Sequence, residues 1–204
     1  MIKLAFFDFA KTVAKGSALK AGAVILDKGG EFDRLFEDFI SHKIDEEGFT
    51  KSAVNLWKGL KIEDLEKIYT KMELNPNVKD VLNELKRREI KLALVSHIPL
   101  RFAELYKNLG FDYLSGNECE VDEGVFTGKI LKINADKSVV VRNLAGKLEI
   151  SLNDCIAVGD SRADIGMFKV VGFDNSFAYN GNEEVKGYAK HHISDFKEII
   201  QIIK

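Results

Sequence analysis

Residues 2–9 read IKLAFFDF, an almost unbroken apolar run with Asp8 near its end. Three further apolar runs follow, at residues 90–96 (IKLALVS), 155–160 (CIAVGD) and 175–180 (NSFAYN). None of the four alternates cleanly between apolar and polar residues, which is the pattern of strands covered on both faces of a parallel sheet. The sequence therefore predicts a buried, mainly parallel β-sheet.

Helical patterns separate these strands. They fall at residues 78–89, 99–110, 137–148, 161–172 and 195–204, and the second ends at Gly110, a residue suited to a helix C-cap. Strands and helices in alternation indicate a three-layer, doubly wound α/β fold. Residues 117–133 differ, because a central Asp-Glu-Gly turn signal joins two strand-like arms, and we predict a β-hairpin flap there.

The region from residue 14 to residue 72 interrupts this alternation. Three amphipathic helical patterns follow one another at residues 30–43, 46–60 and 62–72, with no strand between them. They could belong to the helical layer of the core, but a run of helices directly after the first strand favours a small helical cap. We therefore predict an α/β core of residues 1–13 and 73–204 and a helical cap of residues 14–72.

The composition excludes several classes of protein. The 204 residues include 30 Lys and Arg against 32 Asp and Glu, a net charge of −2, which argues against a nucleic-acid partner. No apolar run approaches the roughly 18 residues of a membrane helix, and the N-terminal run lacks the features of a secretory signal. Cys119 and Cys155 form neither a disulfide framework nor a zinc pattern. We expect a cytoplasmic protein that binds no membrane; the composition leaves its oligomeric state open.

Polar residues that follow the strands point to chemistry. Asp8 ends the first strand, Ser96 ends the second and Asp160 ends the third. In an open α/β sheet ligands bind beyond the carboxyl ends of the strands, so these side chains should meet at one edge. Two carboxylates from different strands suit Mg²⁺ together with a phosphate, and a carboxylate beside such a metal can attack phosphorus.

Four ordered motifs resemble the haloacid dehalogenase-like (HAD) superfamily of phosphatases and phosphotransferases. They are FFDFAKTV with Asp8, LALVS with Ser96, NADKSVVV with Lys137, and GDSRADIGMF with Asp160 and Asp164. The long interval between the first two motifs leaves room for a helical cap. The resemblance is closest to the phosphoserine phosphatase-like branch, in which a hairpin also precedes the lysine.

The resemblance implies a role for each of these residues. Asp8 would attack the phosphorus and form an aspartyl-phosphate, while Ser96 and Lys137, with the neighbouring His97, would hold the phosphoryl oxygens of a small phosphorylated molecule. The implied cofactor is Mg²⁺. Its ligands would be Asp8, the backbone carbonyl of Ala10, Asp160 and Asp164, the last either ligating the ion or orienting the other ligands.

Ala10 departs from the family pattern, which has a second aspartate at this position. That aspartate protonates the leaving alkoxide and later activates water, a contribution typically worth 10²- to 10⁴-fold. We therefore expect weak activity on alkyl phosphates and less impairment on acyl or aryl phosphates, whose leaving groups need no proton. Lys11 and His97 are nearby candidates for a replacement, although a peripheral position is favoured for both; Arg162 and Lys129 are expected at the surface.

Substrate recognition also departs from the phosphoserine phosphatases. Ser17 stands where they carry a cap glutamate, Ala53 where an ungapped match puts the carboxylate-binding arginine, and His97-Ile98 where they carry two glycines. We therefore predict that free phosphoserine is not the natural substrate. Aromatic residues offer an alternative surface, although most of it should be the core of the cap; they are Phe36, Phe39, Phe49 and Trp57.

Three hypotheses follow. The first is a Mg²⁺-dependent hydrolase of a small phosphorylated metabolite that acts through an aspartyl-phosphate on Asp8. The second, motivated by Ala10, is a catalytically impaired relative that binds a phosphorylated ligand or a partner protein. The third is phosphonatase-type or dehalogenase-type hydrolysis with the same nucleophile.

Overall fold

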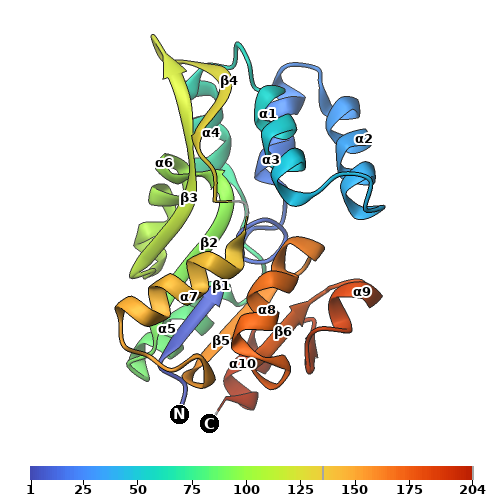
Figure 1. The fold of residues 1–204 in the computed structure, drawn as a ribbon. Helices are drawn as coiled ribbons and strands as arrows, with labels where there is room; N and C mark the ends of the chain where they lie inside the picture. The colour runs from blue at the N-terminus through green and yellow to red at the C-terminus, as the bar shows by residue number, and fades with distance from the viewer. Residues whose placement is uncertain (135, 204) are drawn as a thin grey trace.

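The computed structural model describes residues 1–134 and 136–203. In these residues a seven-stranded sheet has the order β4-β3-β2-β1-β5-β6-β7 (Figure 1). Its strands are β1 (Leu4–Phe7), β2 (Lys91–Pro99), β3 (Tyr113–Asp122), β4 (Val125–Lys132), β5 (Cys155–Gly159), β6 (Ser176–Tyr179) and β7 (His191–Ile193). All neighbours are parallel except β3 and β4, which form the predicted antiparallel hairpin.

Helices cover both faces of the sheet, which explains why the strands lack polar alternation. On β1, Ala5 and Phe7 pack into one apolar cluster, while Leu4 and Phe6 pack into a second on the opposite face. The first cluster includes residues of α5 (Val78–Arg87) and α10 (Lys197–Ile202), and the second includes residues of α7 (Lys137–Lys147) and α8 (Ile165–Val171). The three-layer, doubly wound α/β prediction is confirmed.

Several local predictions need correction. Residues 99–110 form two short elements, α6 (Leu100–Ala103) and the 3₁₀ helix η1 (Glu104–Leu109), which ends at Gly110 with φ +97°. Strand β2 continues past residue 96 to Pro99, with a register shift after Val95. The three-residue β7 and α9 (Glu183–Lys186) were not predicted, because such short elements carry too few residues to show a period. The final residue of the predicted helix 195–204 lies outside the described residues.

The region after β1 contains four helices among its described residues. They are α1 (Ala18–Ile25), α2 (Gly29–Ile40), α3 (Glu46–Asn55) and α4 (Ile62–Lys71). The sequence predicted the last three and missed α1, because its eight residues are mostly apolar and show no polar face. Figure 1 shows α1, α2 and α3 together beyond the carboxyl ends of β1 and β5, and α4 beside β4. The division into core and cap at residues 13 and 73 stays a prediction.

The β3–β4 hairpin joins the helical region through its backbone. Gly59 donates to the carbonyl of Phe126, and Ile62 donates to the carbonyl of Gly124, both at 2.9 Å. Trp57 packs against Phe126 with ring centroids 5.5 Å apart, and its indole N–H donates to the carbonyl of Leu19 at 3.0 Å. Trp57 therefore belongs to the apolar core of the helical region, as the sequence suggested for most of its aromatic residues.

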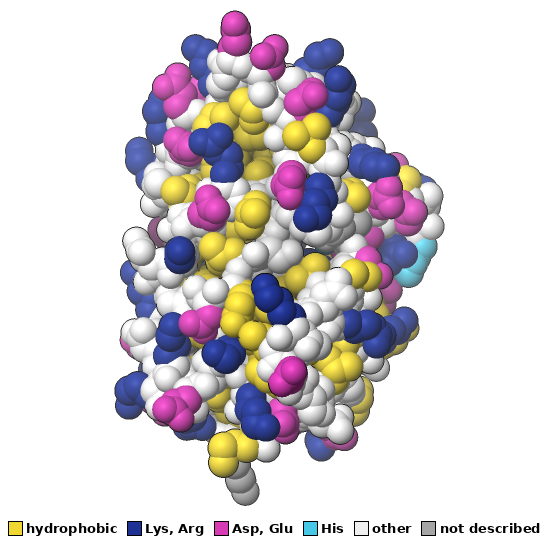
Figure 2. Space-filling view, turned by 60° about the vertical axis from the view of Figure 1, so that its left-hand side comes forward, with side chains coloured by type: hydrophobic (Ala, Val, Ile, Leu, Met, Phe, Trp, Pro, Cys, Tyr) yellow, Lys and Arg dark blue, Asp and Glu magenta, His cyan; other side chains and the backbone are white. Residues whose placement is uncertain are grey.

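Within the described part of the chain, no helix is both long and apolar enough to cross a bilayer. On the face in Figure 2, basic and acidic side chains lie interspersed with apolar ones.

Candidate active site

The three aspartates of the first and last motifs meet at the carboxyl edge of the sheet. Asp8 directly follows β1, Asp160 directly follows β5, and Asp164 ends the 3₁₀ turn η3 (Arg162–Asp164). One carboxylate oxygen of each lies within 4.8 Å of the others. The sequence expectation that these groups converge therefore holds in the structure.

Lys137, the first residue of α7, extends into this acidic group. Its ammonium lies 2.5 Å from Oδ1 of Asp8 and 2.7 Å from Oδ1 of Asp164, and only 2% of its side chain is exposed. The second oxygen of Asp164 accepts hydrogen bonds from the backbone amides of Asp160 and Ser161, each at 3.0 Å. Both oxygens of Asp164 are thus engaged by the protein, so in this geometry Asp164 orients Lys137 and the loop after β5.

The pKa values show an excess of buried negative charge. Burial is the main cause that raises the pKa of Asp8 to about 6; Lys137 opposes the shift and the charge of Asp164 adds to it. The pKa of Asp160 is raised well above its usual value, first by burial and then by the charges of Asp164 and Asp8. Burial alone would lower the pKa of Lys137, but Asp164 and Asp8 together raise it.

These carboxylates fit a divalent cation. One buried ammonium does not balance three carboxylates, and hard oxygen ligands in small number are those that Mg²⁺ prefers. Asp8 and Asp160 would hold the ion together with the backbone carbonyl of Ala10, and Thr12 would steady Asp160, because its hydroxyl donates to Oδ1 of Asp160 at 3.3 Å.

Ser96 and His97 lie on the same edge, inside the extended strand β2. The hydroxyl oxygen of Ser96 accepts from the backbone amide of Ile98 at 3.2 Å, which leaves its O–H to donate to a phosphoryl oxygen. The carbonyl of His97 accepts from the buried Asn117 side chain at 2.6 Å. Nε2 of His97 lies 2.9 Å from Oε1 of Glu46. The 8% exposed ring of His97 is thus held against the first turn of α3.

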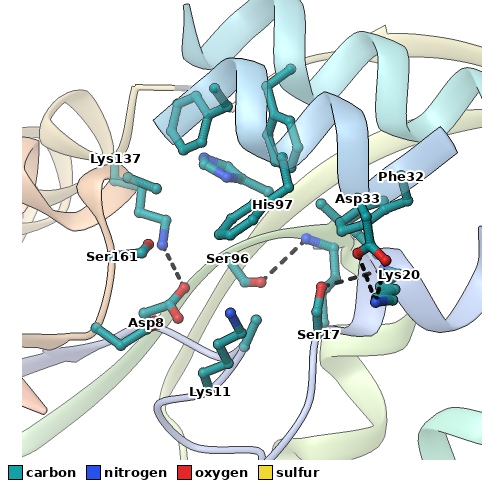
Figure 3. A pocket seen from close by; sticks show the side chains of 18 residues that line it. Asp8, Lys11, Ser17, Lys20, Phe32, Asp33, Ser96, His97, Lys137 and Ser161 are labelled. Carbon is teal, nitrogen blue, oxygen red and sulfur yellow. Dashed lines mark hydrogen bonds and ion pairs between the residues drawn. The ribbon is translucent and has the colours of Figure 1, made fainter. Parts of the chain in front are cut away.

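A cavity of about 250 Å³ opens between these groups and the helical region. At one end lie Asp8, Ser96, Lys137 and Asp160. Side chains from α1 and α2 close the other end, where Figure 3 shows Lys20, Asp33, Ser17 and Phe32 together, away from Asp8 and Lys137. The cavity therefore has a charged phosphate-sized end and a second end formed by the helical region.

Lys11 lies between the two ends. It adopts the left-handed region with φ +58°, and its ammonium lies 4.8 Å from the ring centroid of Phe36. Its charge counteracts the rise in the pKa of Asp160. Lys11 therefore lines the cavity, although the sequence favoured a peripheral position. The same correction applies to His97, which also lines it.

Arg162 and Lys129 were both expected at the surface, but their positions in the structure differ. Arg162, expected at the surface, lies 5.0 Å from the ring centroid of Phe39 and donates to the carbonyl of Phe39, so it connects the loop after β5 to α2. Lys129 is 74% exposed, as expected. Ser17 lines the cavity, whereas Ala53 is fully buried and does not.

Sequence reasoning missed the partners that come from the helical region. Glu46 contacts His97, and Lys20 pairs with Asp33 at 2.6 Å. In sequence Asp33 and Glu46 look like the charged face of any amphipathic helix, and Lys20 is a single charge in a mostly apolar stretch. No local pattern would have identified them, because their role depends on which face turns toward the sheet.

The comparisons with known proteins place the chain in a family. The profile of the haloacid dehalogenase-like hydrolases matches residues 5–169. Phosphoserine phosphatase of Archaeoglobus fulgidus is 32% identical over 196 residues, which cover 94% of this chain and 56% of that protein. This chain thus spans little more than half of that relative. Phosphoserine phosphatase of Methanocaldococcus jannaschii is 29% identical over 207 residues, 99% of this chain and 98% of that protein.

Solved structures agree with this assignment. A phospho-aspartyl intermediate analogue of phosphoserine phosphatase matches with a TM-score of 0.89 at 29% identity, covering 100% of this chain and 99% of that one. A substrate-bound phosphoserine phosphatase matches with a TM-score of 0.90 at the same identity and coverage. The chain therefore belongs to the haloacid dehalogenase-like hydrolase family, in its phosphoserine phosphatase-like branch, and is a phosphoric monoester hydrolase by class.

Proposed function

We propose that the protein hydrolyses a small phosphorylated metabolite through an aspartyl-phosphate on Asp8, with Mg²⁺ as cofactor. The observation that carries this proposal is the buried ammonium of Lys137, 2.5 Å from Asp8 and 2.7 Å from Asp164, beside the carboxylate of Asp160. A lysine and two strand-end aspartates around one cavity provide a nucleophile, a cation site and a positive charge for the phosphoryl oxygens.

Each residue has a distinct task in this mechanism. A carboxylate oxygen of Asp8 attacks the phosphorus, while Lys137 and the hydroxyl of Ser96 hold the phosphoryl oxygens, with His97 beside them. Asp164 keeps Lys137 and the amides of Asp160 and Ser161 in place. When bound, Mg²⁺ would neutralise charge on the phosphoryl group. Asp8, Asp160 and the carbonyl of Ala10 would hold it, and Asp164 would orient these groups.

Ala10 limits the reaction to good leaving groups. Its methyl group lines the cavity but cannot donate or accept a proton. We infer that alkyl phosphates are poor substrates and that the aspartyl-phosphate hydrolyses slowly, because residue 10 offers no carboxylate to activate water. Free phosphoserine is disfavoured for a further reason, because Ala53 lies away from the cavity and Ser17 offers no carboxylate.

We also propose that the protein is cytoplasmic. Cys119 and Cys155 are both free thiols, which is the ordinary state of cysteines in a reducing cytoplasm.

Turnover of p-nitrophenyl phosphate and acetyl phosphate with Mg²⁺ tests the proposal. We expect Asp8→Asn to reduce kcat by more than about 10³-fold, since the amide is not a nucleophile. The matched control is Asp174→Asn, because Asp174 is an exposed aspartate that pairs with Lys190 far from the cavity. Full activity in Asp8→Asn would remove Asp8 as the nucleophile.

The same assay separates the second hypothesis, which rests on Ala10. A protein that binds phosphate but turns over neither substrate, in wild type as in Asp8→Asn, would be a binding protein and not a hydrolase. Cleavage of a carbon–halogen or a carbon–phosphorus bond, without hydrolysis of a phosphate ester, would instead indicate dehalogenase or phosphonatase chemistry.

A further inference from the structure

One wall of the cavity is apolar. Phe39 and Phe49 stack with ring centroids 4.8 Å apart, Phe32 meets Phe49 edge-on at 5.9 Å, and Phe36 lies 6.1 Å from Phe49. Leu19 and Ile98 extend this wall. Because the four rings fix one another, they present a preformed surface of the kind that binds a flat apolar group.

The polar groups on this side of the cavity already have partners. Lys20 and Asp33 neutralise each other at 2.6 Å, and the hydroxyl of Ser17 accepts from the backbone amide of Lys20. His97 contacts Glu46. Among the described residues on this side of the cavity, none therefore presents an unpaired carboxylate or a guanidinium to an amino acid, although the ammonium of Lys11 lies over Phe36. The ammonium of an amino acid would have to break one of these pairs.

The volume sets an upper limit on the substrate. The cavity measures about 250 Å³, whereas pockets for drug-sized ligands measure roughly 300–1,000 Å³. A phosphate and a single ring fit this space. A cavity of this volume favours such a substrate over a nucleotide or a phosphorylated protein segment.

The leaving group is constrained by Ala10. A phenol has a pKa of about 10, as in tyrosine, whereas the pKa of a hydroxyl bound to saturated carbon is far higher and close to that of water. A phenolate can therefore leave without a proton. The carboxylate of Asp8 forms its bond to phosphorus as the aryl oxygen–phosphorus bond breaks, the electron pair stays on the phenolate, and solvent water protonates it. Water then attacks the phosphorus, phosphate takes the proton, and the carboxylate of Asp8 is regenerated.

We propose that the substrate is an aryl phosphate, in which one small aromatic ring lies against the phenylalanine wall and is joined to phosphate through a phenolic oxygen. This inference rests on the proposed function, whose nucleophile it uses, and adds the chemical class of the leaving group. Lys11, over Phe36 and near Asp160, lies between the phosphate end and the wall, where it faces the developing negative charge.

Four substrates test the contributions of the aromatic ring and of the leaving group separately. Phenyl phosphate has both the ring and the good leaving group, benzyl phosphate has only the ring, acetyl phosphate only the leaving group, and O-phospho-L-serine neither. We expect kcat/KM for phenyl phosphate to exceed that for benzyl phosphate by at least about 100-fold, because only the alkyl ester needs the missing acid. Higher kcat/KM for O-phospho-L-serine than for phenyl phosphate would overturn the inference.

A substitution in the wall tests the ring contact. Phe36→Leu keeps an apolar side chain at a half-buried position and should lower kcat/KM for phenyl phosphate by about 2- to 10-fold, while acetyl phosphate changes by less than 2-fold. Phe173→Leu is the matched control, because Phe173 is 55% exposed and does not line the cavity. Equal losses on both substrates would show that Phe36 acts on the fold and not on the ring.

If no substrate turns over, the proposed function fails, but the inference about the aromatic ring can still be tested by a binding measurement. Asp8→Asn with Mg²⁺ is titrated in a calorimeter with phenyl phosphate and with inorganic phosphate. Burial of the ring should make phenyl phosphate at least about 10-fold tighter. Equal affinities would refute an aryl-binding wall.

Discussion

Replacing Ala10 by aspartate should restore the missing proton transfer. The new carboxyl would stand two residues after Asp8, on the cavity wall next to Lys11. The neighbouring carboxylates of Asp8 and Asp160 would raise the pKa of the new carboxyl above its usual value. A raised pKa would keep part of the new carboxyl protonated near neutral pH, as a general acid requires.

The size of the gain should depend on the leaving group. General acid–base catalysis contributes typically 10²- to 10⁴-fold, and the full amount applies only to an alkoxide that cannot leave unprotonated. We expect kcat/KM for benzyl phosphate to rise at least about 100-fold in Ala10→Asp, and kcat/KM for phenyl phosphate to rise less than about 10-fold. If hydrolysis of the aspartyl-phosphate limits turnover in the wild type, the wild type should release an initial burst of phenol. This burst should be smaller in Ala10→Asp.

The assay follows phosphate and phenol release with Mg²⁺ at pH 7, with a thermal melt to confirm folding. A folded Ala10→Asp protein that gains nothing on benzyl phosphate would refute the reasoning, since the missing carboxyl would then not limit turnover. An equal gain on both esters would also refute the reasoning, because it would show that the new carboxyl only activates water and does not protonate the leaving group.

Three further predictions concern stability and the metal. Lys137→Met should destabilise the fold by about 3–5 kcal/mol in urea unfolding, because it leaves the carboxylate of Asp8 buried without its cation. The pKa of Asp8 rises from 3.8 to about 6 on folding, so in metal-free protein this carboxyl stabilises the fold below about pH 4 and that stability is lost as pH rises through 6. Mg²⁺ binds the ionised carboxyl, so the increase in Tm on adding Mg²⁺ should be larger at pH 7.5 than at pH 5. Gly22→Ala should cost about 1–3 kcal/mol and shift the emission of Trp57, the sole tryptophan of the chain, because the new Cβ would lie 2.5 Å from the indole nitrogen.

Matched controls separate these effects from general damage. Lys190→Met removes an exposed cation paired with Asp174 and should leave the urea midpoint unchanged. Gly30→Ala adds a methyl group with no heavy atom within 4 Å and should not destabilise α2. A Lys137→Met protein as stable as wild type, or an equal effect of Mg²⁺ at both pH values, would contradict the charge balance described for the site.

The sequence was sufficient for the strands of the sheet other than β7 and for the charged end of the cavity. Apolar runs without alternation predicted the buried parallel strands, and a polar residue directly after such a run lies at the carboxyl edge because parallel strands point the same way. Asp8, Asp160 and Lys137 were assigned on that ground and on the resemblance of their motifs, and the structure brings them together. Ser96 converges as well, although β2 continues beyond it.

Tertiary structure alone decided the other end of the cavity. Whether Phe36 faces the core of the helical region or the space above Asp8 depends on how α2 is oriented over the sheet. Likewise Glu46 and Arg162 look like solvated charges in sequence, yet one contacts His97 and the other Phe39. A helical period fixes which residues share a face but not what that face meets, so these contacts are set by packing between distant segments and cannot be read from local pattern.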